Sequence, residues 1–401
     1  MLLVKFVIYF LCIARSLSSN FTQLESLYDR LLSDYNKDIR PLIAPEFPVD
    51  VNVSFFPVGI KELDEMTGKF SVVGTFSITW YDLRLTWDVS VYKNFLSVEI
   101  PEKKVWKPGL MVVSPFERFA SLGMGNLPIT YLYNGTALWL PVEVISGTCA
   151  VDVANYPFDI QFCPIELMCW GSPSSAIRIK APDPTINMNY FNRHGTWDVI
   201  HAALSTHLNG DLSYISIDLK LKRRPAFAIM NIVIPMKLLE ILYVLVFFVP
   251  IESGERLSYS ITVLLSIAVF LTIVGDNLPK TSSPISILSY FVLSDLITGS
   301  FVCFTVIFGL SAYYKDPAEE RVPRILARII RQCGRRQTAR KIHRVSNYEN
   351  TMSTNDGTEN VKHVDVTWKM VSRTIDRLML MLCSLYIVVT LFLFLILTTG
   401  K

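Results

Sequence analysis

The chain has 401 residues, of which 51% are apolar and 18% are charged, and its mean hydropathy is +0.37. This balance argues against an ordinary soluble enzyme and favours a protein with a membrane part. The 38 basic and 35 acidic residues leave a net charge of only +3, and no basic stripe is interleaved with aromatic residues, so a nucleic-acid partner is excluded. The 21 prolines and 12% aromatic residues favour a β-rich part beside the membrane part.

The first 19 residues have the layout of a cleaved secretory signal, because Lys5, an apolar run and small residues precede Asn20. A membrane anchor is the alternative interpretation. From residue 20 to 225 no apolar run reaches membrane length, and short segments rich in Val, Ile, Phe, Tyr and Trp alternate with turn clusters such as residues 133–136. We therefore predict an extracellular all-β sandwich over residues 20–225.

The last part of the chain contains four long apolar runs, each near the roughly 20 residues that cross a bilayer. They predict an all-α, four-helix transmembrane domain with three helices in residues 226–313 and the fourth in residues 377–398. Residues 314–376 then contain a cytoplasmic loop, since residues 315–373 hold 13 Lys/Arg against 7 Asp/Glu. Both termini are expected outside. The runs are Phe227–Val249, Leu257–Val274, Ile285–Leu310 and Leu378–Leu397.

Two further patterns fit an extracellular N-terminal domain. The glycosylation sequons at Asn20, Asn52 and Asn134 all precede the first predicted crossing, although short sequons also arise by chance. Once the signal, membrane and cytoplasmic segments are set aside, three cysteines remain outside, which permits one disulfide and one free thiol. The spacing alone does not choose the pairing among Cys149, Cys163 and Cys169.

Residues 149–163, CAVDVANYPFDIQFC, strongly resemble the signature loop of the Cys-loop, or pentameric ligand-gated, receptors. The likeness is greatest to the nicotinic, cation-selective branch, and the chain is similar to a divergent invertebrate member. It extends through nearly the whole mature chain, at Trp80–Trp87, Trp139–Pro141, Trp170, Arg223–Pro225, Ser253–Arg256 and Trp368–Leu378.

This resemblance implies the subunit architecture of a Cys-loop receptor, with a Cys149–Cys163 disulfide and Cys169 free. The same resemblance implies an intracellular helix at the end of residues 314–376, just before the fourth span. It also implies a homo- or heteropentamer with a central pore, a small-molecule neurotransmitter as ligand, and Na⁺ and K⁺ as permeating ions. The protein would lie in the plasma membrane among lipid, at a postsynaptic site, with no cofactor and no metal.

One face of the second predicted span is polar at both ends. Its residues recur at helical steps, and extending them backward reaches Glu252 and Glu255. Lipid does not tolerate such a polar stripe, whereas a water-filled lumen accepts it. The alternative is that the hydroxyl groups bond to helix carbonyls or pack against neighbouring helices. The full predicted pore face is Glu255, Ser258, Thr262, Leu265, Val269, Thr272 and Asp276.

Within this face we expect Leu265 and Val269 to form an apolar gate, and rings of Glu255 and Asp276 to gather cations. Anion-passing relatives usually carry a Pro-Ala segment where this chain has Ser253-Gly254-Glu255, which also favours cations.

The resemblance implies a ligand box of aromatic side chains between subunits, because a ring face attracts an ammonium ion. Trp170 falls at the position of the principal box tryptophan. Val113 and Thr75 stand where two further aromatic residues are usual, and the segment between Trp197 and Tyr214 lacks the adjacent cysteine pair of acetylcholine-binding α subunits. The remaining candidates for ligand contact are Tyr214, His207, His201, Tyr131 and Tyr133.

Transmission from ligand to pore is expected at positions that match the coupling residues of the family. An acid–Arg pair there would be costly to break, and the alternative is an ordinary salt bridge worth about 0–1 kcal/mol if exposed. The positions are Glu65, Tyr156, Pro157, Phe158, Asp159, Arg223 and Pro279. Separately, Lys237 and Glu240 are three residues apart in the first span, and we expect them to pair as a structural element.

The sequence thus predicts a subunit of an extracellular ligand-gated cation channel. A non-binding accessory subunit of a heteromeric receptor, or a proton- or amine-gated channel of the same fold, is the alternative. An enzyme is excluded, because the chain has no phosphate loop, zinc-ligand spacing or nucleophile elbow.

Overall fold

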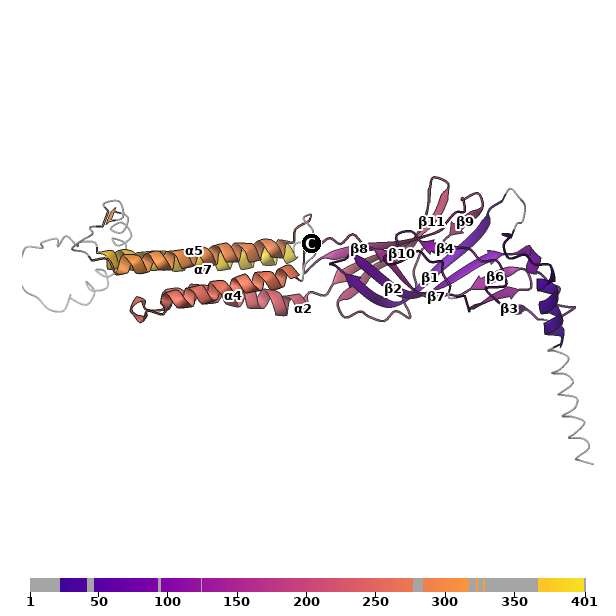
Figure 1. The fold of residues 1–401 in the computed structure, drawn as a ribbon, viewed down its shortest axis with the longest axis horizontal. Coiled ribbons are helices and arrows are strands. Elements are labelled where there is room, and N and C mark those ends of the chain that lie inside the picture. Colours follow the sequence, from indigo (N-terminus) through magenta and orange to yellow (C-terminus); the bar gives the residue numbers. More distant parts are fainter. Residues whose placement is uncertain are drawn as a thin grey trace, which may run out of the picture. The chain divides into compact units, whose positions relative to one another are not determined.

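The computed structural model describes residues 22–41, 47–92, 95–123, 125–276, 284–316, 322–323, 327–328 and 367–399. These residues divide into two compact units (Figure 1). The first contains the described residues up to Asp152 together with Phe158–Arg224, and the second contains Val153–Pro157 and the described residues from Pro225 onward. The predicted signal segment, Asn20 and Pro279 lie outside the described residues.

The first unit is a β-sandwich of two sheets, as the alternating apolar segments predict. One sheet has the strand order β3-β5-β6-β2-β1-β9, with β7 paired to β2, and the other has the order β10-β11-β8-β4. The strands of the first sheet are β1 (Val49–Asp64), β2 (Lys69–Tyr81), β3 (Ser97–Pro101), β5 (Pro128–Leu132), β6 (Thr136–Trp139), β7 (Val142–Thr148) and β9 (Ile177–Lys180). Those of the second are β4 (Leu110–Val112), β8 (Ile160–Cys169), β10 (Trp197–Asn209) and β11 (Leu212–Arg223).

The sandwich core forms because alternate strand residues point inward. Phe55 of β1 and Phe76 of β2 are buried, with ring centroids 4.7 Å apart. A helix over residues 22–33, which the all-β prediction does not include, packs Leu27 and Leu31 onto this core. Its apolar residues follow the helical spacing of an amphipathic segment. A short 3₁₀ helix, η1 (Leu83–Leu85), completes the unit's described helices.

Four helical segments of the second unit are long and apolar enough to cross a membrane, as predicted: Ala226–Phe248, Arg256–Asp276, Ile287–Tyr313 and Trp368–Ile396. The first is composed of α2 (Ala226–Ala228), the π-helical η2 (Ile229–Val233), α3 (Ile234–Leu245) and η3 (Val246–Phe248). The 3₁₀ helix η4 (Ile251–Ser253) follows, and the remaining segments are α4 (Arg256–Asp276), α5 (Ile287–Tyr313) and α7 (Trp368–Thr399).

Two features of these helices differ in detail from the sequence prediction. The π turn of η2 precedes Pro235, whose ring lacks an N–H and clashes with the carbonyl four residues earlier, so the helix widens there. The segment placed in the cytoplasmic loop as a separate helix continues into the last span as one helix, α7. A shared apolar cluster holds α3, α4, α5 and α7 together through residues such as Tyr243, Ile267, Val302 and Met379.

Candidate functional site

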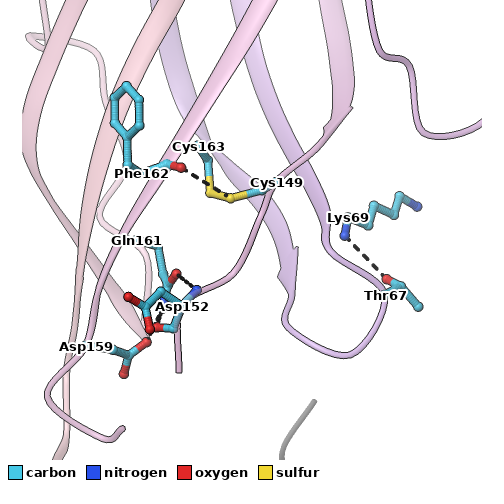
Figure 2. Close-up of a disulfide and its surroundings, with 8 residues drawn as sticks. All are labelled: Thr67, Lys69, Cys149, Asp152, Asp159, Gln161, Phe162 and Cys163. Carbon is cyan, nitrogen blue, oxygen red and sulfur yellow. Dashed lines mark hydrogen bonds between the residues drawn. A yellow bond between two sulfur atoms is a disulfide. The ribbon is translucent and has the colours of Figure 1, made fainter. Parts of the chain in front are cut away.

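A disulfide closes the loop between β7 and β8. Cys149 and Cys163 are joined with their Cα atoms 5.0 Å apart, within the usual range, which confirms the pairing implied by the resemblance (Figure 2). Cys169 is free and buried, and burial raises the pKa of its thiol to about 12. It is therefore an inert apolar residue of the sandwich core.

Gln161 fixes the two limbs of this loop from inside (Figure 2). Its side-chain oxygen accepts a hydrogen bond from the Asp152 backbone N–H at 2.9 Å, and its amide donates to the Asp152 carbonyl at 2.8 Å. The same amide donates to the Asp159 carboxylate. Because Gln161 is fully buried, this residue is a structural clamp that the sequence analysis missed, although the quoted loop motif contains it.

The tip of the loop is part of the helical unit. The carbonyl of Ala154 accepts a hydrogen bond from the backbone N–H of Ile287, at the start of α5, over 2.9 Å. Tyr156 packs against an apolar cluster that includes Ile232 and Val292. Of the predicted coupling residues, Tyr156 and Pro157 thus belong to the second unit, and Phe158 and Asp159 to the first.

A buried ionic cluster lies beside the disulfide loop, where β8 begins and β11 ends. Arg223 donates to both carboxylate oxygens of Asp159, at 2.7 and 3.1 Å, and its Nη1 lies 2.7 Å from a Glu65 oxygen. Its guanidinium also lies 4.2 Å from the ring centre of Trp197. Burial lowers the pKa of Arg223, but the hydrogen bonds and charges of Asp159 and Glu65 outweigh it, so the pKa is raised. The structure therefore brings together three of the predicted coupling residues.

The outer face of the four-stranded sheet carries two of the candidates for ligand contact, His207 and Tyr214. Tyr214 of β11 lies opposite Met168 of β8 and His207 of β10 in the strand register, and opposed residues point to the same face. The rings of His207 and Tyr214 are stacked, with centroids 5.1 Å apart and planes 5° from parallel. His207 Nε2 lies 3.6 Å from Glu166 Oε1, so the stack borders a carboxylate.

Trp170 lies just beyond the end of β8 and is 58% exposed. Its ring packs against Phe119, with centroids 5.7 Å apart. The backbone N–H of Val113 donates to the Glu166 carbonyl at 2.9 Å, so an aliphatic side chain borders this face at the position where the family usually has an aromatic one. Phe119 and Glu166 were not singled out in the sequence, because neither stands in a recognisable periodic pattern.

Three candidates lie elsewhere. Tyr131 is fully buried in β5, inside the sandwich core, so the expectation that it contacts a ligand is corrected. Tyr133 is exposed but follows the same strand, in the other sheet. His201 pairs with Lys220, six residues along β11 from Tyr214, or about 20 Å away. Thr75, in β2, is half-buried.

The predicted pore face of α4 is the exposed face of that helix. All seven of its residues are exposed, whereas Arg256, Ser260, Val263, Ile267 and Val274 on the other side are buried. Thr262 donates to the Ser258 carbonyl at 2.9 Å and Thr272 to the Val269 carbonyl at 2.7 Å, so these hydroxyls bond to the helix as the alternative interpretation states. A hydroxyl that donates inward still presents its oxygen to the exposed face.

Comparison with known proteins decides the family. A model described as the neurotransmitter-gated ion-channel ligand binding domain matches residues 24–225, and one described as the neurotransmitter-gated ion-channel transmembrane region matches residues 232–359. The chain belongs to the neurotransmitter-gated ion-channel family. This family consists of channels rather than enzymes, in agreement with the sequence analysis.

Its relatives are nicotinic receptor subunits. The chain is 28% identical to the neuronal acetylcholine receptor subunit alpha-6 of Pan troglodytes over 313 residues, which is 75% of this chain and 62% of the relative. It is 27% identical to the alpha-6 subunit of Mus musculus over 77% of this chain and 63% of the relative. It is also 27% identical to the alpha-3 subunit of Bos taurus over 74% and 61%. The match spans about three fifths of each relative's length.

A second buried ion pair joins the start of α4 to α7. Arg256 donates to both carboxylate oxygens of Asp376 on α7, at 3.0 and 2.6 Å, and is 1% exposed. The Tyr313 hydroxyl donates to Glu252 at 2.6 Å in the same region. The sequence analysis quoted the segments of Arg256 and Asp376 without pairing them. Each of the two residues stands beside other charged residues, such as Glu255 and Arg377, so the sequence alone gave no signal that these two would pair.

The sequons within the described residues differ in accessibility. Asn134 is exposed in the turn between β5 and β6, where its side-chain oxygen accepts from the Thr136 N–H at 3.1 Å. Asn52 is half-buried within β1, between β2 and β9. The geometry therefore favours Asn134 as the more accessible acceptor for a glycan.

Proposed function

We propose that this chain is a subunit of a pentameric cation channel in the plasma membrane, opened by a small extracellular ligand, with a pore lined by α4. The observation that carries the proposal is the exposed face of α4, on which acidic residues, hydroxyls and two apolar residues follow one another along the helix. Closed rings are the common way in which subunits assemble around an axis. Five such faces around one axis give a water-filled lumen.

Ion selectivity in this proposal comes from carboxylates at the two ends of α4. Rings of Glu255 and Asp276 create a negative potential that concentrates Na⁺ and K⁺ and repels Cl⁻. Between them, rings of Leu265 and Val269 form the apolar constriction, which excludes water when the pore is narrow.

The ligand in this proposal is a small organic cation that contacts Trp170. The exposed ring of Trp170, the stacked rings of His207 and Tyr214 and the carboxylate of Glu166 are groups that suit an ammonium ion. The printed names of the relatives make acetylcholine one candidate. Val113 and Thr75 remove two aromatic walls, and this favours a different amine or a site completed by another subunit.

The missing aromatic walls at Val113 and Thr75 also support a second candidate, an accessory subunit that binds no ligand itself. A proton-gated channel is a third candidate, supported by the 3.6 Å approach of His207 to Glu166, which places an imidazole beside a carboxylate on the exposed side of the four-stranded sheet.

Strands β8 and β11 provide the proposed route from ligand to pore. Glu166 and Tyr214 lie on the ligand face of these strands, and Asp159 and Arg223 lie at their far ends. Asp159 is two residues from Pro157, so a movement of the strands is carried along the chain into the loop tip that belongs to the helical unit.

The test is to express the chain alone and with nicotinic-type subunits, and to record current against a panel of small amines and of pH. Ligand-dependent current whose reversal potential follows the Na⁺ gradient supports the proposal, and native mass spectrometry of the purified complex gives the subunit number. A Cl⁻-selective current, or a chain that reaches the surface in every combination without changing any current, contradicts it. Current evoked by acid alone and removed by His207→Gln would favour proton gating.

A further inference from the structure

Polar and charged side chains of three helices meet inside the helical unit. The Lys237 ammonium of α3 donates to Glu240, as the sequence predicts, and also to Thr390 Oγ1 of α7 at 3.4 Å. Asp295 of α5 lines a small cavity together with Glu240, and its Oδ1 accepts from the Tyr386 hydroxyl of α7 at 2.8 Å. The sequence analysis did not include Asp295 or Tyr386, because their apolar runs conceal single polar positions.

The charges of this cluster do not balance when every group is ionised. Glu240 and Asp295 are 1% and 3% exposed, and one ammonium, that of Lys237, faces the two carboxylates. Glu240 Oε2 and Asp295 Oδ2 have no hydrogen-bond donor among the described residues. The two carboxyl groups line the same small cavity. Two adjacent buried carboxylates repel strongly unless a positive charge lies between them.

The space beside the two carboxyl groups limits what that positive charge can be. A cavity of about 10 Å³ is lined by Glu240, Asp295 and, from α4, Ile267 and Phe270. Such a volume holds about one water molecule. An organic cation does not fit, which leaves a proton or a single small metal cation.

We propose that Glu240 and Asp295 bind one proton between them, so that the cluster with Lys237 is neutral and α3 is hydrogen-bonded to α5 behind the helix α4. The proton turns one carboxylate into a donor and satisfies both orphan oxygens at once. The titratable groups that face this site are Lys237 and Tyr243 from α3, Asp295 from α5, and Cys383 and Tyr386 from α7, while the facing residues of α4, Ile267 and Phe270, do not titrate.

Loss of the proton places a second negative charge against Ile267 and Phe270 of α4. Water or a cation must then enter the cavity, and the packing of α4 changes. Control of a pore by this route rests on the proposed function, whereas occupancy of the site by a proton does not.

Infrared spectroscopy of the purified full chain in lipid nanodiscs tests the proposal without recording any current. At neutral pH the wild type should show the carbonyl band of a buried, protonated carboxyl group, shifted in D₂O. Glu240→Gln and Asp295→Asn should each remove the band, because either change leaves one carboxylate for Lys237. Glu99→Gln, which alters an exposed carboxylate of β3, should leave the band in place.

Two outcomes overturn the proposal. A band that survives both amide variants places the protonated carboxyl elsewhere. A wild type with no band, and with a thermal midpoint that rises when Na⁺ replaces N-methylglucamine, shows a bound metal cation instead. If one variant fails to fold, the other decides, and a chain that conducts no ions still gives either result, so failure of the channel proposal is distinguishable.

Discussion

Asp159→Asn tests whether the buried ionic cluster stabilises the folded protein more than an exposed ion pair does. Asp159 is 2% exposed and accepts two hydrogen bonds from Arg223, which is itself 7% exposed. Asparagine keeps the size of the side chain but removes its charge, and it leaves Arg223 with Glu65 as the remaining carboxylate of the cluster. Breaking a buried ion pair by removing one partner costs about 3–5 kcal/mol. Because Glu65 still offsets part of the Arg223 charge, we expect the lower end, about 3 kcal/mol.

The matched control is the ion pair of Asp198 with Arg224, the residue that follows Arg223. Asp198 accepts hydrogen bonds from Arg224, and both side chains are exposed. The hydrogen bond from Arg224 lowers the pKa of Asp198 below its usual range, so any stabilisation by this pair is present at neutral pH and lost as the pH falls through that lowered pKa. Exposed pairs of this kind contribute little, and Asp198→Asn should behave like the wild type at neutral pH.

The assay is thermal unfolding of the purified full chain in detergent at neutral pH, followed by tryptophan fluorescence. Trp197 stacks on Arg223 and reports on the cluster directly. One kcal/mol corresponds to roughly 2–4 °C for a unit of about 200 residues, so Asp159→Asn should lower the midpoint by roughly 6–12 °C. Equal shifts for Asp159→Asn and Asp198→Asn would refute the reasoning, since burial would then not distinguish the two pairs.

Other changes address the pore, the free thiol and the ligand face. Leu265→Ser should hydrate the constriction and give greater agonist sensitivity or a standing current, and if only Val269→Ser opens the channel, the gate lies one turn outward. Glu255→Ala should lower the permeability ratio of Na⁺ to Cl⁻ measured from reversal potentials; an unchanged ratio contradicts its role as the selectivity ring. Because burial raises the pKa of Cys169 to about 12, its thiol is neutral at ordinary pH and iodoacetamide should label it only after denaturation; labelling of the native chain would show an accessible thiolate. The chain expressed alone should not give robust micromolar acetylcholine currents, since each missing aromatic wall costs a quaternary ammonium about 0.5–2 kcal/mol; such currents, abolished by Trp170→Ala with surface expression intact, would mean that other residues rebuild the box.

The sequence predicted the features that depend on short, local residue patterns. The four spans follow from long apolar runs. The exposed face of α4 follows from the steps between Ser258 and Asp276, because helix geometry alone places those residues on one side. The disulfide follows from a short motif within one loop. None of these inferences requires knowledge of which distant segments meet.

Contacts between distant segments could not be predicted in this way. Arg256 and Asp376 are separated by 120 positions, and no periodicity in either helix indicates the other partner. Tyr131 illustrates a different error, since it was judged by residue type rather than by strand position. It shares the inward face of β5 with Ile129, two residues earlier, and that alternation alone predicts burial.

The polar face of α4 needs water or ions around it, and lipid around a single chain supplies neither. The exposed residues of α5 and α7 are mainly large apolar side chains such as Phe304 and Phe392, for which hydrocarbon is a suitable solvent. The hydroxyl of Thr262 satisfies its donor on a helix carbonyl, but the carboxylate of Glu255 requires water or a cation. In the proposed ring of subunits, the lumen supplies both.

The Arg256–Asp376 pair determines which face of α4 is exposed. A helical residue turns by about 100° from its neighbour, so rotating α4 by one position would bring Glu255 toward α7 and its carboxylate against that of Asp376. The same rotation would expose the buried guanidinium of Arg256 and break both of its hydrogen bonds. Each consequence opposes the rotation, because like charges repel and a buried charge loses its partner. The orientation of the proposed pore-lining residues is therefore set from the buried side of α4, by an ion pair to α7, as well as by the sequence of the face itself.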